Sequence, residues 1–350
     1  MEVSTEETPS ITVSFLVKKS SNSFISIKIM NKLSNNYVKL IKDLCVCPSC
    51  KSELLVKKDN IKCKKCQRKF SIIQGIPILI DSKISNSTHN KYKNFKIDKN
   101  ALKKDKYANS NYINKYLAAT NGFFYEKKKN KKIAIPNIDL KTSNSRDLLL
   151  DIGCGWGRWC FAASKKNYLP VGIETNLNLL LTAKRYSEEN NIDAFFIYAD
   201  ALNLPFKKNK FNTIFSFSVF QHFPKKDFFS VLKSTKNILK KNGLFKFQIM
   251  NIVGLRCIYT NFILRKKQPK HFFPEYYFIN DIISYCKKYY SKTSVTNCSF
   301  FTQARITDYN SFTTKHKIFM NFTYLINTLC KIFPFMKYFS DNVYINLSKK

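Results

Sequence analysis

Three glycines at alternate positions follow a short apolar run and precede a segment of helical length. They are Gly153, Gly155 and Gly157, and Asp151 lies two residues before the first of them. Glycine lets a backbone turn tightly and approach a ligand without a clash from a β-carbon. The N–H groups that open the following helix attract a negatively polarised group. This spacing predicts a loop that binds a nucleotide-like cofactor.

The position of the third glycine distinguishes between two kinds of cofactor. A dinucleotide-binding loop, G-x-G-x-x-G, would need its last glycine at position 158, where this chain has Arg158. The observed order, an acid two residues before G-x-G-x-G, suits S-adenosylmethionine better, with the loop near its methionine carboxylate. A nicotinamide oxidoreductase is therefore disfavoured, and a bare tight turn is the structural alternative.

Two more acids stand at the expected ends of the next two strands. Glu174 follows Asp151 by 23 residues, where a carboxylate can accept hydrogen bonds from both ribose hydroxyls. Asp200 is placed to accept a hydrogen bond from an adenine amino group, and the N–H of Ala201 or Leu202 could contact the ring edge. One such acid could be a solvated strand-end residue, but three in register with the loop predict a cofactor site.

The elements that would position these residues alternate between strand-length apolar runs and helix-length segments. This alternation predicts βαβ units, an α/β fold and a parallel sheet buried on both faces. The expected strands are 148–152, 171–173, 194–198, 213–217 and 244–249, the expected helices are 177–189 and 225–239, and 342–347 is expected as a last edge strand.

Four cysteines form two C-x2-C pairs separated by twelve residues: Cys47, Cys50, Cys63 and Cys66. Four thiolates at this spacing suit a closed, tetrahedral structural zinc site with no open position for catalysis. A segment of about 35 residues buries too little surface to fold alone, so zinc would supply the missing free energy. The alternative is a loop that has lost its metal.

Residues 148–250 resemble the class I S-adenosylmethionine-dependent methyltransferases of type 11, the group that includes ubiquinone- and menaquinone-biosynthesis methyltransferases. The resemblance implies a Rossmann-like fold in which the glycines shape the methionine pocket, Glu174 binds ribose and Asp200 binds adenine. Asn212 departs from the family, which usually has Asp there. The implied cofactor-binding residues are Asp151, Gly153, Gly155, Gly157, Glu174, Asp200, Ala201 and Phe217. The cysteine segment resembles the small zinc-ribbon activator of tRNA, rRNA and release-factor methyltransferases, here fused to the catalytic domain.

Methyl transfer from a sulfonium needs a general base only if the acceptor must lose a proton. His222, just past the fourth strand, is the catalytic candidate because its unperturbed pKa lies near working pH. The alternative is a histidine that only hydrogen-bonds the backbone. His271, in the aromatic stretch 270–277, is a candidate for lining the acceptor pocket.

The formal net charge of +37 would suit a nucleic-acid binder, but only seven of the 60 basic residues are arginine, the residue that phosphate and base recognition favours. The fourth strand also lacks the motifs for methylating exocyclic base amines or cytosine C5. We therefore expect a small-molecule, lipid or glycan-precursor acceptor. The alternatives are an RNA (tRNA or rRNA) methyltransferase and a non-catalytic cofactor-binding scaffold.

We expect four parts: a disordered tail (1–40), the zinc-ribbon module (41–80), a linker with an N-terminal helix (81–145) and the methyltransferase domain (146–350). The domain would comprise a core (146–255) and an aromatic lid with the final strand (256–350). The apolar stretch 318–339 is expected to form core packing or a lid rather than to touch a membrane. Eleven cysteines without a secretory leader, and no bilayer-length apolar run, favour a cytoplasmic protein without stable membrane insertion. The oligomeric state stays open.

Overall fold

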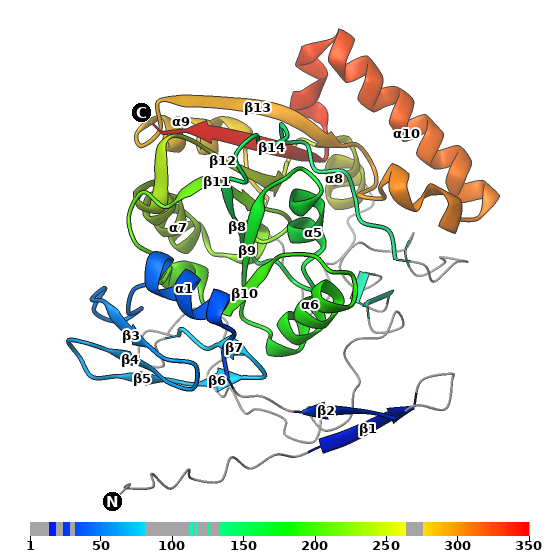
Figure 1. The fold of residues 1–350 in the computed structure, drawn as a ribbon. Helices are drawn as coiled ribbons and strands as arrows, with labels where there is room; N and C mark the ends of the chain where they lie inside the picture. The colour runs from blue at the N-terminus through cyan, green and yellow to red at the C-terminus, as the bar shows by residue number, and fades with distance from the viewer. Residues whose placement is uncertain are drawn as a thin grey trace, which may run out of the picture.

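The computed structural model describes residues 14–18, 24–28, 32–80, 113–114, 116–117, 125, 133–263 and 276–349. A seven-stranded sheet lies at its centre, in the order β10-β9-β8-β11-β12-β14-β13 (Figure 1). Strands β8 to β12 are parallel, and β14 runs antiparallel to both of its neighbours. The strands are β8 (Leu148–Ile152), β9 (Leu169–Glu174), β10 (Phe195–Tyr198), β11 (Phe211–Ser216), β12 (Leu239–Met250), β13 (Lys292–Ser299) and β14 (Asn342–Ser348).

The predicted Rossmann-like α/β fold is confirmed, with one error at the end of the sheet. The run 342–347 does form a strand, but β14 pairs on both sides, with β12 and with β13. The edge is β13, which was not predicted because its sequence, KTSVTNCS, is mostly polar and mostly outside the core. An apolar strand such as β14 gains more from the interior position of a sheet than a polar one does.

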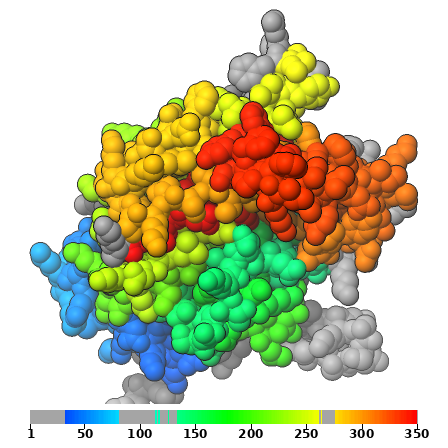
Figure 2. Space-filling model, turned by 90° about the horizontal axis from the view of Figure 1, so that it is seen from above, coloured from blue at the N-terminus to red at the C-terminus, as the bar shows by residue number. Residues whose placement is uncertain are grey.

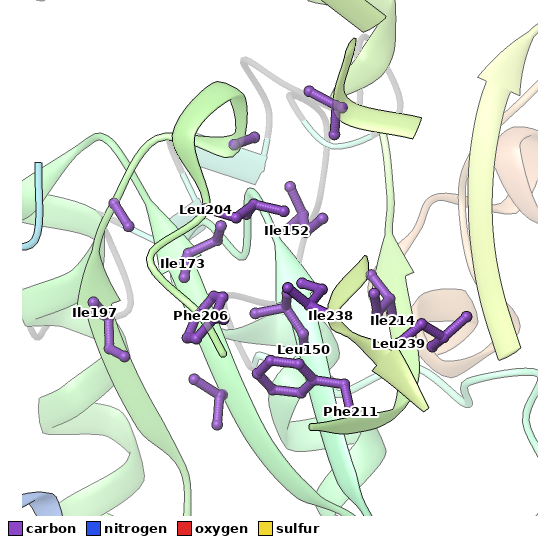
Figure 3. Packing of buried hydrophobic residues seen from close by; sticks show 14 of the residues in the cluster. Leu150, Ile152, Ile173, Ile197, Leu204, Phe206, Phe211, Ile214, Ile238 and Leu239 are labelled. Atoms are coloured by element: carbon purple, nitrogen blue, oxygen red, sulfur yellow. The ribbon is translucent and has the colours of Figure 1, made fainter. Parts of the chain in front are cut away.

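Helices cover both faces of the sheet (Figure 1). One core cluster joins the sheet to α1, α7 and α9, and a second joins it to α5 and α6. Figure 3 shows part of the first cluster, where Leu150, Ile173 and Ile197 from adjacent strands meet Phe206 and Phe211. The helices are α1 (Asn35–Leu44), α5 (Arg158–Ser164), α6 (Leu177–Glu189), α7 (Lys225–Ile238), α8 (Leu255–Cys257), α9 (Ile279–Lys287) and α10 (Thr314–Ile332). Shorter helical turns are η2 (Ala201–Asn203), η3 (Phe220–His222), η4 (Ile258–Ile263), η5 (Ile306–Ser311) and η6 (Pro334–Phe339).

The cysteine segment folds as a small antiparallel unit of β3 (Leu54–Val56), β4 (Ile61–Cys63) and β5 (Lys69–Phe70), followed by the hairpin β6 (Ile72–Ile73) and β7 (Ile76–Pro77). It docks on the free edge of β10: Ile78 forms a parallel bridge with Tyr198, and the N–H of Leu79 donates to the Tyr198 carbonyl at 2.8 Å. The cysteine segment therefore covers the edge that the central sheet would otherwise expose.

Strands and part of a helix lie within residues 1–40, the segment that we expected to be a tail. Strands β1 (Ser14–Lys18) and β2 (Phe24–Lys28) pair as an antiparallel hairpin, and α1 runs across the expected boundary at residue 40. Helix α1 begins after Ser34, whose side chain accepts a hydrogen bond from the Tyr37 N–H, and it buries Ile41 and Leu44 in the core. Most of the expected linker lies outside the described residues.

Among the described residues, none of the helices combines the length and the apolar character needed to cross a membrane.

Candidate cofactor site and metal centre

The glycine loop connects β8 to α5 at the carboxyl edge of the sheet. All three glycines have positive φ angles, of 70°, 55° and 85° for Gly153, Gly155 and Gly157. A β-carbon on Gly153 would lie 2.4 Å from Cγ2 of Val219, and one on Gly157 would lie 2.7 Å from the Phe161 ring. Both the backbone angles and the packing therefore require glycine at these two positions.

Asp151 lies just before this loop, near the end of β8, and is 1% exposed. Its Oδ2 accepts a hydrogen bond from the Cys160 thiol at 3.4 Å, whereas Oδ1 has no hydrogen-bond partner among the described residues. Burial raises the pKa of this carboxyl to about 7, and the charge of Glu174 adds to the shift. An orphaned buried carboxylate oxygen beside a glycine loop fits a positively charged ligand group.

Glu174, at the end of β9, faces the same loop. Its Oε2 accepts from the Gly155 N–H at 3.2 Å, and its Oε1 accepts from the N–H groups of Thr175 and Asn176 at 2.7 and 3.1 Å. Burial raises the pKa of the carboxyl, and these backbone donors oppose that shift. The carboxylate is therefore held in one orientation, and Oε2 keeps acceptor capacity for a hydroxyl group.

Asp200 follows β10 and caps η2, because its Oδ1 accepts from the Leu202 N–H at 2.9 Å. The cysteine segment forms hydrogen bonds to the loop that follows Asp200. Lys51 donates from Nζ to the Leu204 carbonyl at 3.2 Å and to the side chain of Asn203, and the Val46 N–H donates to the Pro205 carbonyl at 2.9 Å. These contacts could not be predicted from the sequence, because they join segments about 150 residues apart.

Phe217 and His222 follow β11 at the same edge of the sheet. The Phe217 ring packs against Trp159 at 4.8 Å between centroids, and the Arg305 guanidinium lies 4.9 Å from its centre. His222 ends η3, where its N–H donates to the Val219 carbonyl. The structure thus brings Phe217 close to residues of the C-terminal region, and His271 lies outside the described residues.

A buried ion pair links the glycine loop to the C-terminal region. Arg158, the first residue of α5, donates from Nη2 to Oδ2 of Asp308 in η5 at 2.7 Å, and the two side chains are 7% and 0% exposed. The Tyr125 hydroxyl donates to the same oxygen at 2.8 Å. The sequence offers one hint of this ion pair, which is that Arg158 occupies the position where a dinucleotide-binding loop has its third glycine.

The four predicted metal-binding cysteines come together in the folded chain. All four Sγ atoms lie within 4.8 Å of one another, with Cys47 and Cys66 3.7 Å apart and Cys50 and Cys63 3.4 Å apart. Tetrahedral zinc with bonds of about 2.3 Å places its sulfur ligands roughly 3.8 Å apart. The donor set and its spacing therefore fit zinc, while Cys45 is buried outside the cluster.

Comparisons with known proteins address the central part of the chain. Residues 149–243 match the family described as a methyltransferase domain. The chain is similar to a demethylmenaquinone methyltransferase of Staphylococcus saprophyticus, with 27% identity over 139 residues covering 38% of this chain and 57% of the relative. It is also similar to a ubiquinone biosynthesis O-methyltransferase of Pelagibacter ubique, with 31% identity over 103 residues covering 29% and 42%.

The chain spans about half the length of the curated relatives it matches. Among solved structures, an S-adenosylmethionine-dependent methyltransferase of Methanosarcina mazei aligns with 13% identity and a TM-score of 0.43, covering 61% of this chain and 99% of that one. The methyltransferase domain is supported by the family match over residues 149–243 and agrees with the strand order. It does not rest on this structural likeness.

Proposed function

We propose that this chain, whose residues 149–243 form a class I S-adenosylmethionine-dependent methyltransferase domain, transfers a methyl group to a small apolar or lipid-like acceptor. The observation that carries the proposal is the edge where β8, β9 and β10 end. There Asp151, with its orphaned oxygen, lies near the end of β8, and the glycine loop follows that strand. Glu174 ends the adjacent strand β9, and Asp200 follows β10, next to β9.

Each residue has a role that its surroundings support. Bound S-adenosylmethionine supplies a methyl group on a positively charged sulfur, which is a good leaving group. Asp151 places negative charge beside the positively charged end of the cofactor, Glu174 accepts from the ribose hydroxyls, and Asp200 accepts from the adenine amino group. Ala201, buried at the start of η2, presents its N–H to the ring edge. Holding the acceptor in line and excluding water then provide most of the acceleration.

The proposed acceptor class rests on the aromatic residues at the end of β11. The half-buried Phe217 ring contacts the buried rings of Trp159 and Tyr344, and the half-buried Arg305 guanidinium lies over Phe217 and Trp159. An accessible aromatic ring beside a cationic group would suit a flat or apolar acceptor with one polar group. Two of the relatives, a demethylmenaquinone methyltransferase and a ubiquinone biosynthesis O-methyltransferase, are named for acceptors of this class. His222 would take the proton if that polar group is a hydroxyl.

We further propose that Cys47, Cys50, Cys63 and Cys66 hold a structural zinc ion. The ion would fix the two cysteine turns, and the segment would in turn hold the loop that carries Asp200 through Lys51 and Val46. In this scheme zinc stabilises the site and takes no part in methyl transfer.

Titration calorimetry with S-adenosylhomocysteine tests the cofactor site. We expect wild-type protein to bind it and Glu174→Gln to bind about 10- to 100-fold more weakly, because charge-assisted hydrogen bonds to the ribose are lost. The matched control is Glu188→Gln on the exposed surface of α6, which should bind like wild type. Folded wild-type protein that binds NAD but not S-adenosylhomocysteine would contradict the proposal.

Transfer of labelled methyl groups identifies the acceptor class. Cell lipid extract, water-soluble extract and bulk tRNA and rRNA are each incubated with labelled S-adenosylmethionine and the protein. We expect label in the lipid fraction or in an apolar small molecule. Label confined to RNA at about 0.15 M salt, where loose lysine contacts fade, would replace this acceptor with the RNA alternative.

The raised pKa of Asp151 predicts that cofactor affinity depends on pH. A cationic ligand group binds better to the ionised carboxyl, so affinity should rise as the pH increases through the Asp151 pKa of about 7 and level off above about pH 8. Asp151→Asn should flatten this profile while keeping the side-chain shape.

The stability of the ligand-free protein should change in the opposite direction. Because the folded state holds the Asp151 proton more tightly than the unfolded state, stability falls as the pH rises from about 4 to about 7. An unchanged pH profile in Asp151→Asn would show that another group is responsible.

A further inference from the structure

Helix α10 carries an apolar stripe on its outer side. Ile318, Phe322, Leu325 and Ile332 recur at spacings of four, three and seven residues and are 65%, 51%, 56% and 64% exposed. This spacing places them on one face of the helix. A stripe of this size facing outward cannot be explained by scattered single hydrophobic residues on a surface.

The orientation of the helix is fixed by contacts on its other side. Met320, Thr323 and Cys330 are buried there, and Asn327 accepts a hydrogen bond from Asn297 of β13 at 2.7 Å. The ring centroids of Phe301 and Phe322 are 6.1 Å apart, so this one residue of the stripe also contacts the loop after β13. The expectation that the stretch 318–339 forms core packing or a lid therefore holds only for the inward side.

Phe333 and the turn η6 continue the apolar stripe past the end of α10. Phe333, Phe335 and Phe339 are 49%, 62% and 48% exposed. Helix α10 lies at the margin of the molecule, and Figure 2 shows its residues and those of η6 on the surface (Figures 1 and 2). We refer to the stripe of α10, Phe333 and the turn η6 together as the apolar surface.

The acidic and basic residues within α10 and η6 all have one sign of charge. The sequence has no Asp or Glu between Asp308 and Asp341, whereas four lysines lie there: Lys315, Lys317, Lys331 and Lys337. Lysines near both ends of an apolar helix suit a helix that lies in the plane of an anionic lipid surface. A second copy packed on the same surface would bring like charges together.

We propose that α10 and η6 attach this protein peripherally to an anionic lipid bilayer. The aromatic and aliphatic side chains of the apolar surface enter the region between headgroups and acyl chains, and the lysines contact anionic headgroups. The attachment is independent of the proposed methyl transfer, and vesicle binding is measured without cofactor. The two proposals can therefore fail separately.

Vesicle flotation tests the attachment. Full-length protein should float with vesicles of phosphatidylcholine mixed with phosphatidylglycerol and much less with phosphatidylcholine alone. The combined variant Ile318→Ser, Leu325→Ser and Ile332→Ser should bind at least about tenfold more weakly, because three exposed apolar side chains no longer enter the lipid. The matched control, Leu55→Ser with Phe278→Ser, changes side chains of similar exposure elsewhere and should float like wild type.

Fluorescence of Tyr324→Trp gives a second readout that does not depend on the serine variant folding. Tyr324 is 59% exposed on α10, whereas the native Trp156 and Trp159 are 2% and 7% exposed. Anionic vesicles should shift the added emission to the blue, and brominated lipid should quench it.

Three results would overturn the proposal: wild-type protein that stays with the unbound fraction, equal binding by the serine variant and the control, or a tryptophan that does not respond to lipid. A dimer that light scattering detects in wild type but not in the serine variant, without flotation, would assign the apolar surface to a second copy instead.

Discussion

Asp308→Ala should destabilise the protein by about 3–5 kcal/mol, measured by urea unfolding. The change leaves the Arg158 guanidinium buried without its carboxylate and removes the acceptor of the Tyr125 hydroxyl. An unpaired buried charge lowers the free energy of unfolding by far more than the intact ion pair adds to it. Because Arg158 opens α5 directly after Gly157, S-adenosylhomocysteine binding should weaken as well.

The matched control is the exposed pair Arg146–Asp193, whose side chains are both 53% exposed. Asp193→Ala should cost no more than about 1 kcal/mol. The double variant Arg158→Met with Asp308→Leu should recover much of the stability that the single change loses, because no unpaired charge is left. Equal effects of Asp308→Ala and Asp193→Ala would show that burial of the pair contributes nothing.

Features set by short-range patterns could be predicted from the sequence. The run 148–152 matches β8, 177–189 matches α6, and the two C-x2-C pairs predict the cysteine cluster. In each case the periodicity or the ligand spacing lies within one segment. The three acids could be placed at one edge because parallel strands end on the same side.

Features set by distant pairing could not be predicted. The Arg158–Asp308 bond joins residues 150 positions apart, and one basic and one acidic residue carry no sign that they are partners. The polar strand β13 has no apolar pattern, so the sequence predicts 342–347 rather than β13 as the edge of the sheet. The sequence predicts core packing or a lid for the stretch 318–339, because composition shows how apolar a helix is but not which of its sides meets the rest of the protein.

Removal of zinc should affect more than the cysteine segment. We expect purified protein to contain about one zinc per chain and Cys63→Ser to lose it, because a site with three thiolates binds far more weakly. Metal binding is part of the folding free energy of such small units, so loss should unfold the segment. Elemental analysis and thermal unfolding measure the two effects.

Unfolding of the cysteine segment should also weaken cofactor binding, because the segment contacts the loop after β10. Without it, the loop after β10 loses Lys51 and Val46, and the edge of β10 loses the bridge between Ile78 and Tyr198. Since Asp200 belongs to this loop, Cys63→Ser should bind S-adenosylhomocysteine at least about tenfold more weakly. Cys45→Ser is the matched control, because this buried thiol lies outside the cluster and should leave the zinc content unchanged.

Lys51→Ala distinguishes the loss of zinc from the loss of the contact between the cysteine segment and the loop after β10. It should keep the zinc yet weaken cofactor binding by several-fold, because the side chain that holds the Leu204 carbonyl is gone. If the Cys63→Ser protein lacks zinc, has an unfolded cysteine segment and still binds S-adenosylhomocysteine with full affinity, then the sheet alone orders the loop that carries Asp200. Weakening in both variants, with zinc lost in only one, would place the coupling at the contact between the cysteine segment and the loop after β10.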